Sequence, residues 1–193
     1  RIEERTRELH EKEAVLRAIF DNSTAAIDLM DAKGRYVLVN GEYERRYGVP
    51  PEALHGTTPS DHFPPAVADE ILRRTRQVVR NGEPTTIEAV REFSDGTRHN
   101  LLITKFPIRD ADGKVSHVGS FATDITERIE AETALRHSRE RFRAFMDNAS
   151  SAMMMKDRDG RYIVVNREFL RRHGLQSESE VLGKTVFDLY PKE

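Results

Sequence analysis

The feature that most constrains this sequence is an internal repeat. Residues 16–48 match residues 142–174 at an offset of 126 positions, and 15 of the 32 positions between Arg17 and Gly48 are identical. After a one-residue insertion, Gly56, Thr58, Asp61 and Pro64 face Gly183, Thr185, Asp188 and Pro191. Such self-similarity predicts a duplicated domain. The first copy continues through residues 65–127, and nothing after Glu193 corresponds to that stretch, so we expect the second domain to lack its C-terminal half.

The repeat divides the chain into four segments. We expect a linker helix over residues 1–20, a first domain over 21–126, a connecting helix over 127–141 and the N-terminal half of a second domain over 142–193. Because the chain opens on arginine and ends without a change of composition, we expect it to be part of a longer protein. Any output domain would then lie outside these residues.

Composition disfavours several classes of protein. The 31 lysines and arginines and 33 aspartates and glutamates give a net charge of −2 without a block of one sign, so we expect no nucleic-acid partner. The absence of cysteine excludes disulfides and thiolate metal sites and fits a cytoplasmic location. No apolar stretch approaches the ~18 residues that span a bilayer, so we expect no membrane segment.

The first half of the first copy predicts a hairpin followed by helices. Short apolar runs at residues 26–30 and 35–40 flank a turn, which is typical of a β-hairpin. Asn40 stands at the N-cap position of a short helix that Gly48 closes. Apolar residues at helical spacing then predict a longer helix over 66–80, which ends at Asn81 and Gly82.

The second half predicts three antiparallel strands over residues 85–93, 99–108 and 115–123, joined by two turns that contain Asp and Gly. In the first of them Glu88 and Glu92 share one phase, so Ile87, Ala89, Arg91 and Phe93 should face the core. The second strand is apolar on both phases, which indicates that both faces of the sheet are covered. One face would meet the domain's own helices, and the other a flanking helix or a second subunit.

These residues resemble the PAS family of sensory domains. The resemblance rests on FDNSTAAI at 20–27, GRYVLVN at 34–40, NGEP at 81–84 and Asp124-Ile125-Thr126, together with the element order. It covers nearly all of 17–127 and the first half again at 142–193. It implies an α+β fold, in which a five-stranded antiparallel sheet pairs its first strand with its last and carries helices on its concave face. It also implies a sensory module of a multidomain signal-transduction protein, such as a sensor histidine kinase.

The resemblance implies a ligand pocket between the sheet and the helices. We expect its lining on the three-stranded meander: Ile87, Ala89, Arg91, Leu101, Ile103, Ser120 and Ala122. Arg91 is the one charge on the inward phase of its strand, and a buried guanidinium needs an anionic partner. It would either meet an acidic ligand or, as we favour, lie near the strand end and reach water.

The identity of a cofactor stays open. Flavin-binding photosensory members use a cysteine, which this chain lacks, and haem-binding members supply a histidine from the long helix, where this chain has Ile71. Redox-sensing flavin members tend to use tryptophan, which is also absent. A cysteinyl-flavin is therefore excluded and haem is disfavoured. A small apolar or weakly acidic ligand, or no ligand, remains.

The connecting helix carries the relay that the resemblance implies. Asp124, Ile125 and Thr126 lead the last strand into this helix, and Asp124 with Glu127 has the spacing of a capping box. Beyond it, a heptad seam is formed by Ala131, Leu135, Ser138, Phe142 and Phe145. We favour a homodimeric coiled coil over a helix that packs back on its own sheet.

Three functions remain to be compared. We favour a sensory module without catalysis, whose output domain, such as a kinase, a cyclic-dinucleotide enzyme or a transcription regulator, lies outside the chain. The alternatives are a ligand-free scaffold for dimerisation and an enzyme, for which the apolar pocket residues offer no acid or base. In the second copy, residues 152–156 should form an apolar edge without a neighbour, which is poorly ordered or pairs with another chain.

Overall fold

The computed structural model describes residues 2–190. Contacts divide the chain into two compact units, of which the first ends at Ile129 and the second begins at Glu130. Arg1, where the expected linker helix starts, and Pro191, where the repeat match ends, lie outside the described residues. The two units are described separately below.

The first unit opens with helix α1 (Ile2–Asp21) and the predicted hairpin of strands β1 (Ala26–Asp31) and β2 (Tyr36–Val39). Helix α2 (Gly41–Tyr47) follows. The Asn40 side chain caps its N-terminus by accepting a hydrogen bond from the Tyr43 backbone N–H, and Gly48 ends it in the left-handed conformation. Both predicted caps are confirmed.

Short helical turns connect this part to the long helix. They are α3 (Pro51–Leu54) and the 3₁₀ turn η1 (Pro59–Asp61), and each starts with proline in the first turn, where a missing N–H costs least. Helix α4 (Pro65–Asn81) then ends at Gly82, again in the left-handed conformation. The predicted helix over 66–80 is therefore confirmed with one more residue at each end.

The predicted meander is confirmed as strands β3 (Thr85–Glu92), β4 (Arg98–Arg109) and β5 (Val115–Asp124). The five strands form one antiparallel sheet in the order β2-β1-β5-β4-β3, so the first strand pairs with the last. Along β3 every second residue is exposed, and Ile87, Ala89 and Arg91 fall on the more buried phase, as predicted. The chain thus has the expected α+β architecture.

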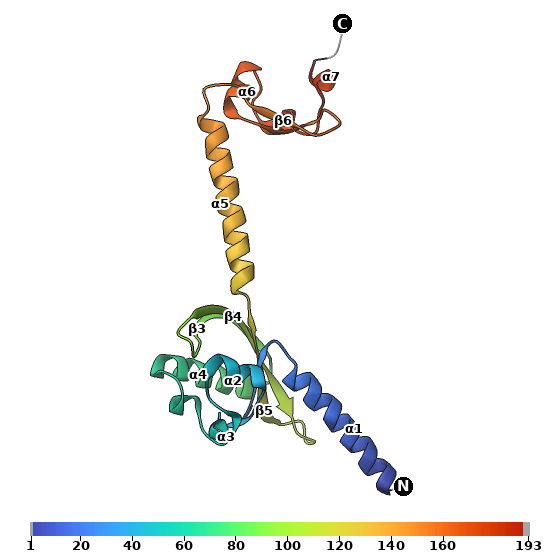
Figure 1. The fold of residues 1–193 in the computed structure, drawn as a ribbon, viewed down its shortest axis with the longest axis vertical. Helices are drawn as coiled ribbons and strands as arrows, with labels where there is room; N and C mark the ends of the chain where they lie inside the picture. Colours follow the sequence, from blue (N-terminus) through green and yellow to red (C-terminus); the bar gives the residue numbers. More distant parts are fainter. Residues whose placement is uncertain (1, 191–193) are drawn as a thin grey trace. The chain divides into compact units, whose positions relative to one another are not determined.

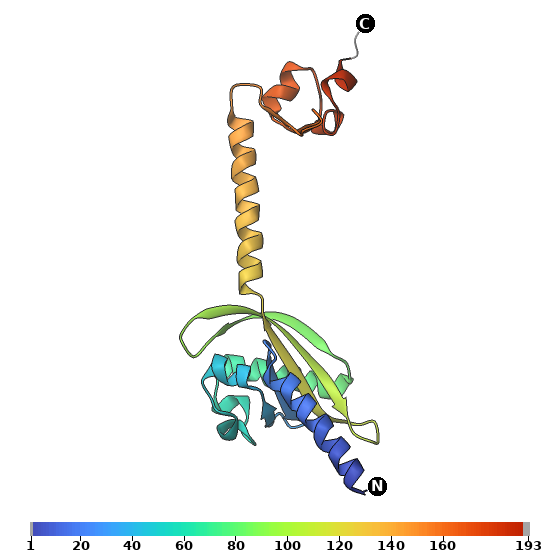
Figure 2. The same cartoon turned by 45° about the vertical axis from the view of Figure 1, so that its right-hand side comes forward.

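Helices α2, α3 and α4 lie on the concave side of the curved sheet (Figures 1 and 2). The core between these layers joins buried residues of the hairpin, α2, α3 and the central strands: Ala26, Met30, Tyr36, Val39, Tyr43, Leu54, Leu101 and Ala122. The outer face keeps apolar side chains at the surface, among them Leu38, Val90, Ile108 and Phe121. The expected cover over that face is not supplied by the described residues of this single chain.

A buried asparagine joins the hairpin to its neighbours. The Asn40 Nδ2 group donates to the backbone oxygens of Phe20 and Ala25, while Oδ1 accepts from the backbone N–H groups of Ile27 and Tyr43. All four hydrogen bonds measure 2.9–3.0 Å, and the side chain is fully buried. One amide therefore holds the end of α1, the start of β1 and the start of α2 together.

Helix α5 (Thr126–Asn148), yellow to orange in Figure 1, is unbroken and continues past Arg141. No helix within residues 2–190 has the length and apolar character needed to cross a membrane.

The second unit repeats the beginning of the first. Strands β6 (Met154–Lys156) and β7 (Tyr162–Val165) pair with each other, and helix α6 (Arg167–Arg172), the 3₁₀ turn η2 (Glu178–Glu180) and helix α7 (Val186–Leu189) follow. Asn166 repeats the fourfold bonding of Asn40 through its contacts with the backbone of Met146 and three later residues. Within the described residues β6 pairs with β7 alone, and Met154 and Met155 are exposed. How well this edge is ordered in solution stays a prediction.

Candidate functional site

The site starts from small side chains on the central strand. Ser120 of β5 lies between Asp28 of β1 and Lys105 of β4 in the same cross-strand row. In the next row Ala122 lies between Ala26 and Ile103. Because side chains two residues apart on a strand share a face, Ser120 and Ala122 together leave a hollow on the concave side of the sheet.

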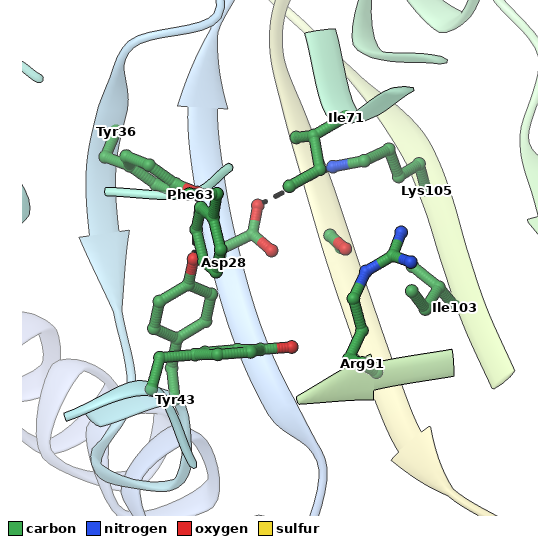
Figure 3. A pocket seen from close by; sticks show the side chains of 11 residues that line it. Asp28, Tyr36, Tyr43, Phe63, Ile71, Arg91, Ile103 and Lys105 are labelled. Carbon is green, nitrogen blue, oxygen red and sulfur yellow. Dashed lines mark hydrogen bonds and ion pairs between the residues drawn. The ribbon is translucent and has the colours of Figure 1, made fainter. Parts of the chain in front are cut away.

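A cavity of about 40 Å³ fills this hollow. Helices and strands contribute to its wall, which is formed by Asp28, Tyr36, Tyr43, Tyr47, Phe63, Ile71, Arg91, Ile103, Lys105, Ser120 and Ala122 (Figure 3). A water molecule needs ~10–15 Å³ of such free space, so the cavity holds about three of them, and it lies far below the ~300–1,000 Å³ of pockets for drug-sized ligands. The cavity in this conformation suits a very small ligand or the head of a larger one.

Two opposite charges face each other across the cavity (Figure 3). The Asp28 carboxylate oxygen Oδ2 lies 3.8 Å from the Lys105 ammonium nitrogen, and both side chains are buried. A charged contact of this length is an ion pair but exceeds the usual hydrogen-bond distance. Lys105 reaches Asp28 across the β5 strand because the intervening Ser120 is small.

Tyrosines form the wall beside Asp28 (Figure 3). The hydroxyls of Tyr36 and Tyr43 lie 2.8 Å apart and share a hydrogen bond, and the Tyr47 ring packs against Tyr43. Burial raises the pKa of Tyr36 and of Tyr43 well above the ordinary value and raises the pKa of Tyr47 to about 12. All three hydroxyls are therefore protonated at neutral pH.

Arg91 has a protein partner. Its guanidinium donates to the Glu70 carboxylate of α4 at 2.7 Å, and its side chain is only 10% exposed. The expectation that Arg91 reaches water at the strand end was therefore wrong, because a helix that passes over the strand supplies the anion. Burial raises the pKa of Glu70, but hydrogen bonds from Arg91 and Arg74 outweigh it and hold this pKa below the ordinary value.

The structure brings together four of the seven residues expected to line the pocket. Arg91, Ile103, Ser120 and Ala122 line the cavity. Leu101 is fully buried in the core, and Ile87 and Ala89 are half-buried on β3, outside the cavity lining. The reason is register: Leu101 and Ala89 form a row with Asp124 near the sheet end, and Ile87 lies on the edge strand.

Sequence reasoning missed the polar half of the cavity. Asp28 stood within a run taken as apolar, and Lys105 within a strand of which only the apolar residues were assigned to faces. A signal was present, since Asp28 shares the inward phase of β1 with Ala26 and Met30, as Lys105 shares that of β4 with Leu101 and Ile103. Within residues 2–190 there is no group of three or more histidine, cysteine, aspartate or glutamate side chains that could hold a metal ion.

The exit from the sheet into α5 is tightly bonded. The backbones of Ile125 and Asn100 are joined by a 2.9 Å hydrogen bond, and the Thr126 hydroxyl accepts from the Asn100 N–H at 2.8 Å. Asp124 accepts from the Thr126 N–H and lies 2.7 Å from the His99 ring nitrogen Nδ1. These bonds tie the start of α5 to β4, in place of the capping-box contact expected between Asp124 and Glu127.

Arg46 connects helix α2 to strand β5, close to the point where β5 leads into α5. Its guanidinium donates to the backbone oxygens of Ala122 and Thr24 and to the Glu42 carboxylate, at 2.7–2.8 Å. The side chain is 5% exposed. Through Arg46, helix α2 holds the same segment of β5 that lines the cavity.

The expected seam residues lie along α5. Leu135, Phe142 and Phe145 are exposed large apolar side chains, and Ala131 and Ser138 are exposed as well. These side chains are available for contacts that a single chain does not provide.

Comparison with known proteins decides the family. Residues 20–130 match the family model described as PAS fold, and residues 140–192 match a second model described as PAS domain. The chain belongs to the PAS family. Both repeats are therefore PAS sequences, and the cavity lies within the first of them.

Three similar proteins illustrate the relationship. FilI, a methanogenesis regulatory histidine kinase of Methanothrix harundinacea (strain 6Ac), is 31% identical over 134 residues, which are 69% of this chain and 15% of FilI. The PAS domain of Bordetella pertussis BvgS is 25% identical, with a TM-score of 0.54 over 67% of this chain and 98% of that one. The Vibrio cholerae VqmA dimer is 25% identical, with a TM-score of 0.54 over 57% of this chain and 50% of that one.

The relatives agree with the sensory role expected from the PAS resemblance. This chain is a sensory PAS module of a signal-transduction protein. It spans only 15% of the length of FilI.

Proposed function

We propose that the first PAS domain senses a small ligand in the Asp28–Lys105 cavity and passes the change to helix α5. The observation that carries this proposal is that a single strand, β5, both lines the cavity and leads into helix α5. Ser120 and Ala122 of β5 line the cavity, and the same strand ends at Asp124, directly before Ile125 and α5. A shift of β5 against its neighbours would therefore reach the helix over a few residues.

The hydrogen bonds where β5 leads into α5 support a rigid connection that can transmit movement from the sheet to the helix. Ile125 is buried, and the Asn100 backbone holds both Ile125 and Thr126. Because these bonds restrain the backbone of Asp124, Ile125 and Thr126, movement of β4 or β5 would change the direction or rotation of α5. A buried, hydrogen-bonded junction is the kind of element that moves between discrete arrangements.

We propose further that the module acts as a homodimer through the α5 seam. The exposed Leu135, Phe142 and Phe145 recur at heptad spacing, which suits a parallel coiled coil. The similar VqmA is a dimer. In such a pair the seam would carry a change in helix rotation into whatever follows the chain.

The rest of the protein is proposed from its relatives and composition. A kinase output, as in the regulatory histidine kinase FilI, is the output we favour, and catalysis would belong to that part rather than to this chain. The lack of cysteine fits a cytoplasmic location. A VqmA structure is bound to DPO, which supports a ligand-binding role for a fold of this kind.

The small volume of the cavity favours one alternative, a ligand-free scaffold with a filled core. Mass spectrometry of the purified chain, denatured to release bound molecules, together with an absorbance spectrum, separates the two functions. A released small molecule supports the sensor. An apoprotein that binds nothing from a metabolite library supports the scaffold.

Light scattering tests the proposed dimer. The chain has a mass of 22.2 kDa, and we expect about twice this value at micromolar concentration. Leu135→Asp with Phe142→Asp places two carboxylates in the seam and should give the monomer mass, because burying unpaired charge is costly. Arg136→Asp with Glu140→Asp, outside the seam, should leave the dimer intact. A monomeric unmodified chain would contradict the dimer.

A further inference from the structure

The Asp28 side chain leaves a buried polar atom unsatisfied. Its Oδ2 oxygen has no hydrogen-bond partner among the described residues, although Asp28 is only 8% exposed. The nearest cation, the Lys105 ammonium, stays 3.8 Å away. A buried acceptor without a hydrogen bond is costly, so native structures rarely keep one without a reason.

The hairpin does not require a carboxylate at this position. In the second copy Met154 stands at the position of Asp28, and Met154 pairs with Val165 just as Asp28 pairs with Val39. The hairpin therefore forms with an uncharged side chain at this place. Asp28 and Lys105 both line the cavity.

The charges around the cavity are balanced before any ligand enters. Asp28 faces Lys105, and the Arg91 guanidinium is paired with Glu70 at 2.7 Å. Arg74 also contacts Glu70, at 3.4 Å, but it is not among the residues that line the cavity. An anionic ligand would add a buried negative charge without a free cation, and a cationic ligand the reverse. Because an unpaired buried charge is expensive, a neutral ligand is favoured. An acidic ligand was one possible partner for Arg91. It is no longer supported, because the Arg91 guanidinium is already paired with Glu70.

We infer that the cavity selects a small neutral molecule, or the neutral head of a larger one, that carries a hydrogen-bond donor next to an acceptor. An amide, lactam or urea group has this chemistry. Its N–H would donate to Asp28 Oδ2 while its carbonyl oxygen accepts from the Lys105 ammonium, so both buried charges gain a hydrogen bond. The inference rests on the proposed function, because it assumes that the cavity is the ligand site.

Four probes of equal size test the inference on the full chain: acetamide, acetone, acetate and acetamidinium. Each has four non-hydrogen atoms, so only charge and hydrogen bonding differ. Binding is followed by NMR through the backbone amide signals of Ser120, Ala122 and Ile103. Molecules with four non-hydrogen atoms bind in the millimolar range unless they reach the highest binding energy per atom known for small ligands. The titration should therefore reach about 100 mM. We expect acetamide to bind about tenfold more tightly than the other three.

Two variants reverse the preference in opposite directions. Asp28→Asn leaves the Lys105 ammonium without its counter-charge and should favour acetate. Lys105→Met keeps most of the side-chain volume, leaves Asp28 unpaired and should favour acetamidinium. Glu88→Gln, on the exposed phase of β3, should keep the ranking of the unmodified chain. If one variant fails to fold, the other variant and the unmodified chain still decide the matter.

Failure of this inference is distinct from failure of the proposed function. If acetate, acetamidinium or acetone shifts the cavity amides at least as readily as acetamide, the ligand class is wrong and ligand sensing survives. If none of the four probes shifts these amides, the inference and the ligand-binding part of the proposed function both fall.

Discussion

Replacing Asn40 with leucine should destabilise the first unit by about 3–5 kcal/mol. The number and branching of the side-chain heavy atoms are kept, but the four hydrogen bonds of the amide are lost. The N–H groups of Ile27 and Tyr43 and the oxygens of Phe20 and Ala25 then lose this partner in a fully buried place. Hydrogen exchange of β4 and β5 peptides, followed by mass spectrometry, measures the change in the free energy of opening.

Two asparagines provide matched controls. Asn81, exposed at the end of α4, should change stability by less than about 0.5 kcal/mol when replaced with leucine. Asn166→Leu should loosen the peptides of the second unit and leave β4 and β5 protected, because Asn166 makes the same four bonds there. Equal protection of β4 and β5 in Asn40→Leu and the unmodified chain would refute the role assigned to Asn40.

Replacing Arg46 with methionine should cost a similar amount, about 3–5 kcal/mol, because it breaks a buried ion pair by removing one partner. The change also removes the donor to the backbone oxygens of Ala122 and Thr24. Urea unfolding followed by near-ultraviolet circular dichroism, which reports the buried tyrosines, measures the loss. Arg46→Lys should fall in between, since an ammonium cannot reproduce the planar fork that meets three acceptors.

Arg45 is the matched control for Arg46. Both guanidiniums bind the Glu42 carboxylate at 2.7 Å, but the Arg45 side chain is 64% exposed and that of Arg46 is 5% exposed. Arg45→Met should therefore cost no more than about 1 kcal/mol. If the two methionine variants lose equal stability, the carboxylate contact alone accounts for the effect, and the link to β5 is unimportant.

Local sequence signals sufficed for the elements of the first unit. The strands of the meander were predictable because acids such as Glu88 mark one phase and Asp-Gly turns separate the runs. Asn40 and Gly48 predicted the ends of α2 because capping also depends on local sequence, namely on the residues next to the helix. The order of the strands in the sheet came from the family resemblance, because no local signal states that β1 pairs with β5.

The polar contacts of the site depend on distant residues, which is why they escaped prediction. Arg91 and Glu70 come from a strand and a helix 21 positions apart. Asp28 and Lys105 lie on strands that do not pair with each other, and they meet only because β5 carries a small residue between them. Both pairs require the strand order and the position of α4, so periodicity within one segment does not reveal them.

The central claim is that the state of the cavity determines the state of α5, and a distance between two protomers tests it most directly. The chain has no cysteine, so Glu140→Cys adds a single spin-label site outside the seam of α5. Pulsed electron spin resonance should give one narrow distance distribution between protomers of the labelled chain. Lys105→Met and Asp28→Asn, which change the charge of the cavity, should move it by about 1–2 Å, the size of known helix shifts, and Glu88→Gln should not. Absence of any distance between protomers, or an unchanged distribution in both cavity variants, would contradict the account.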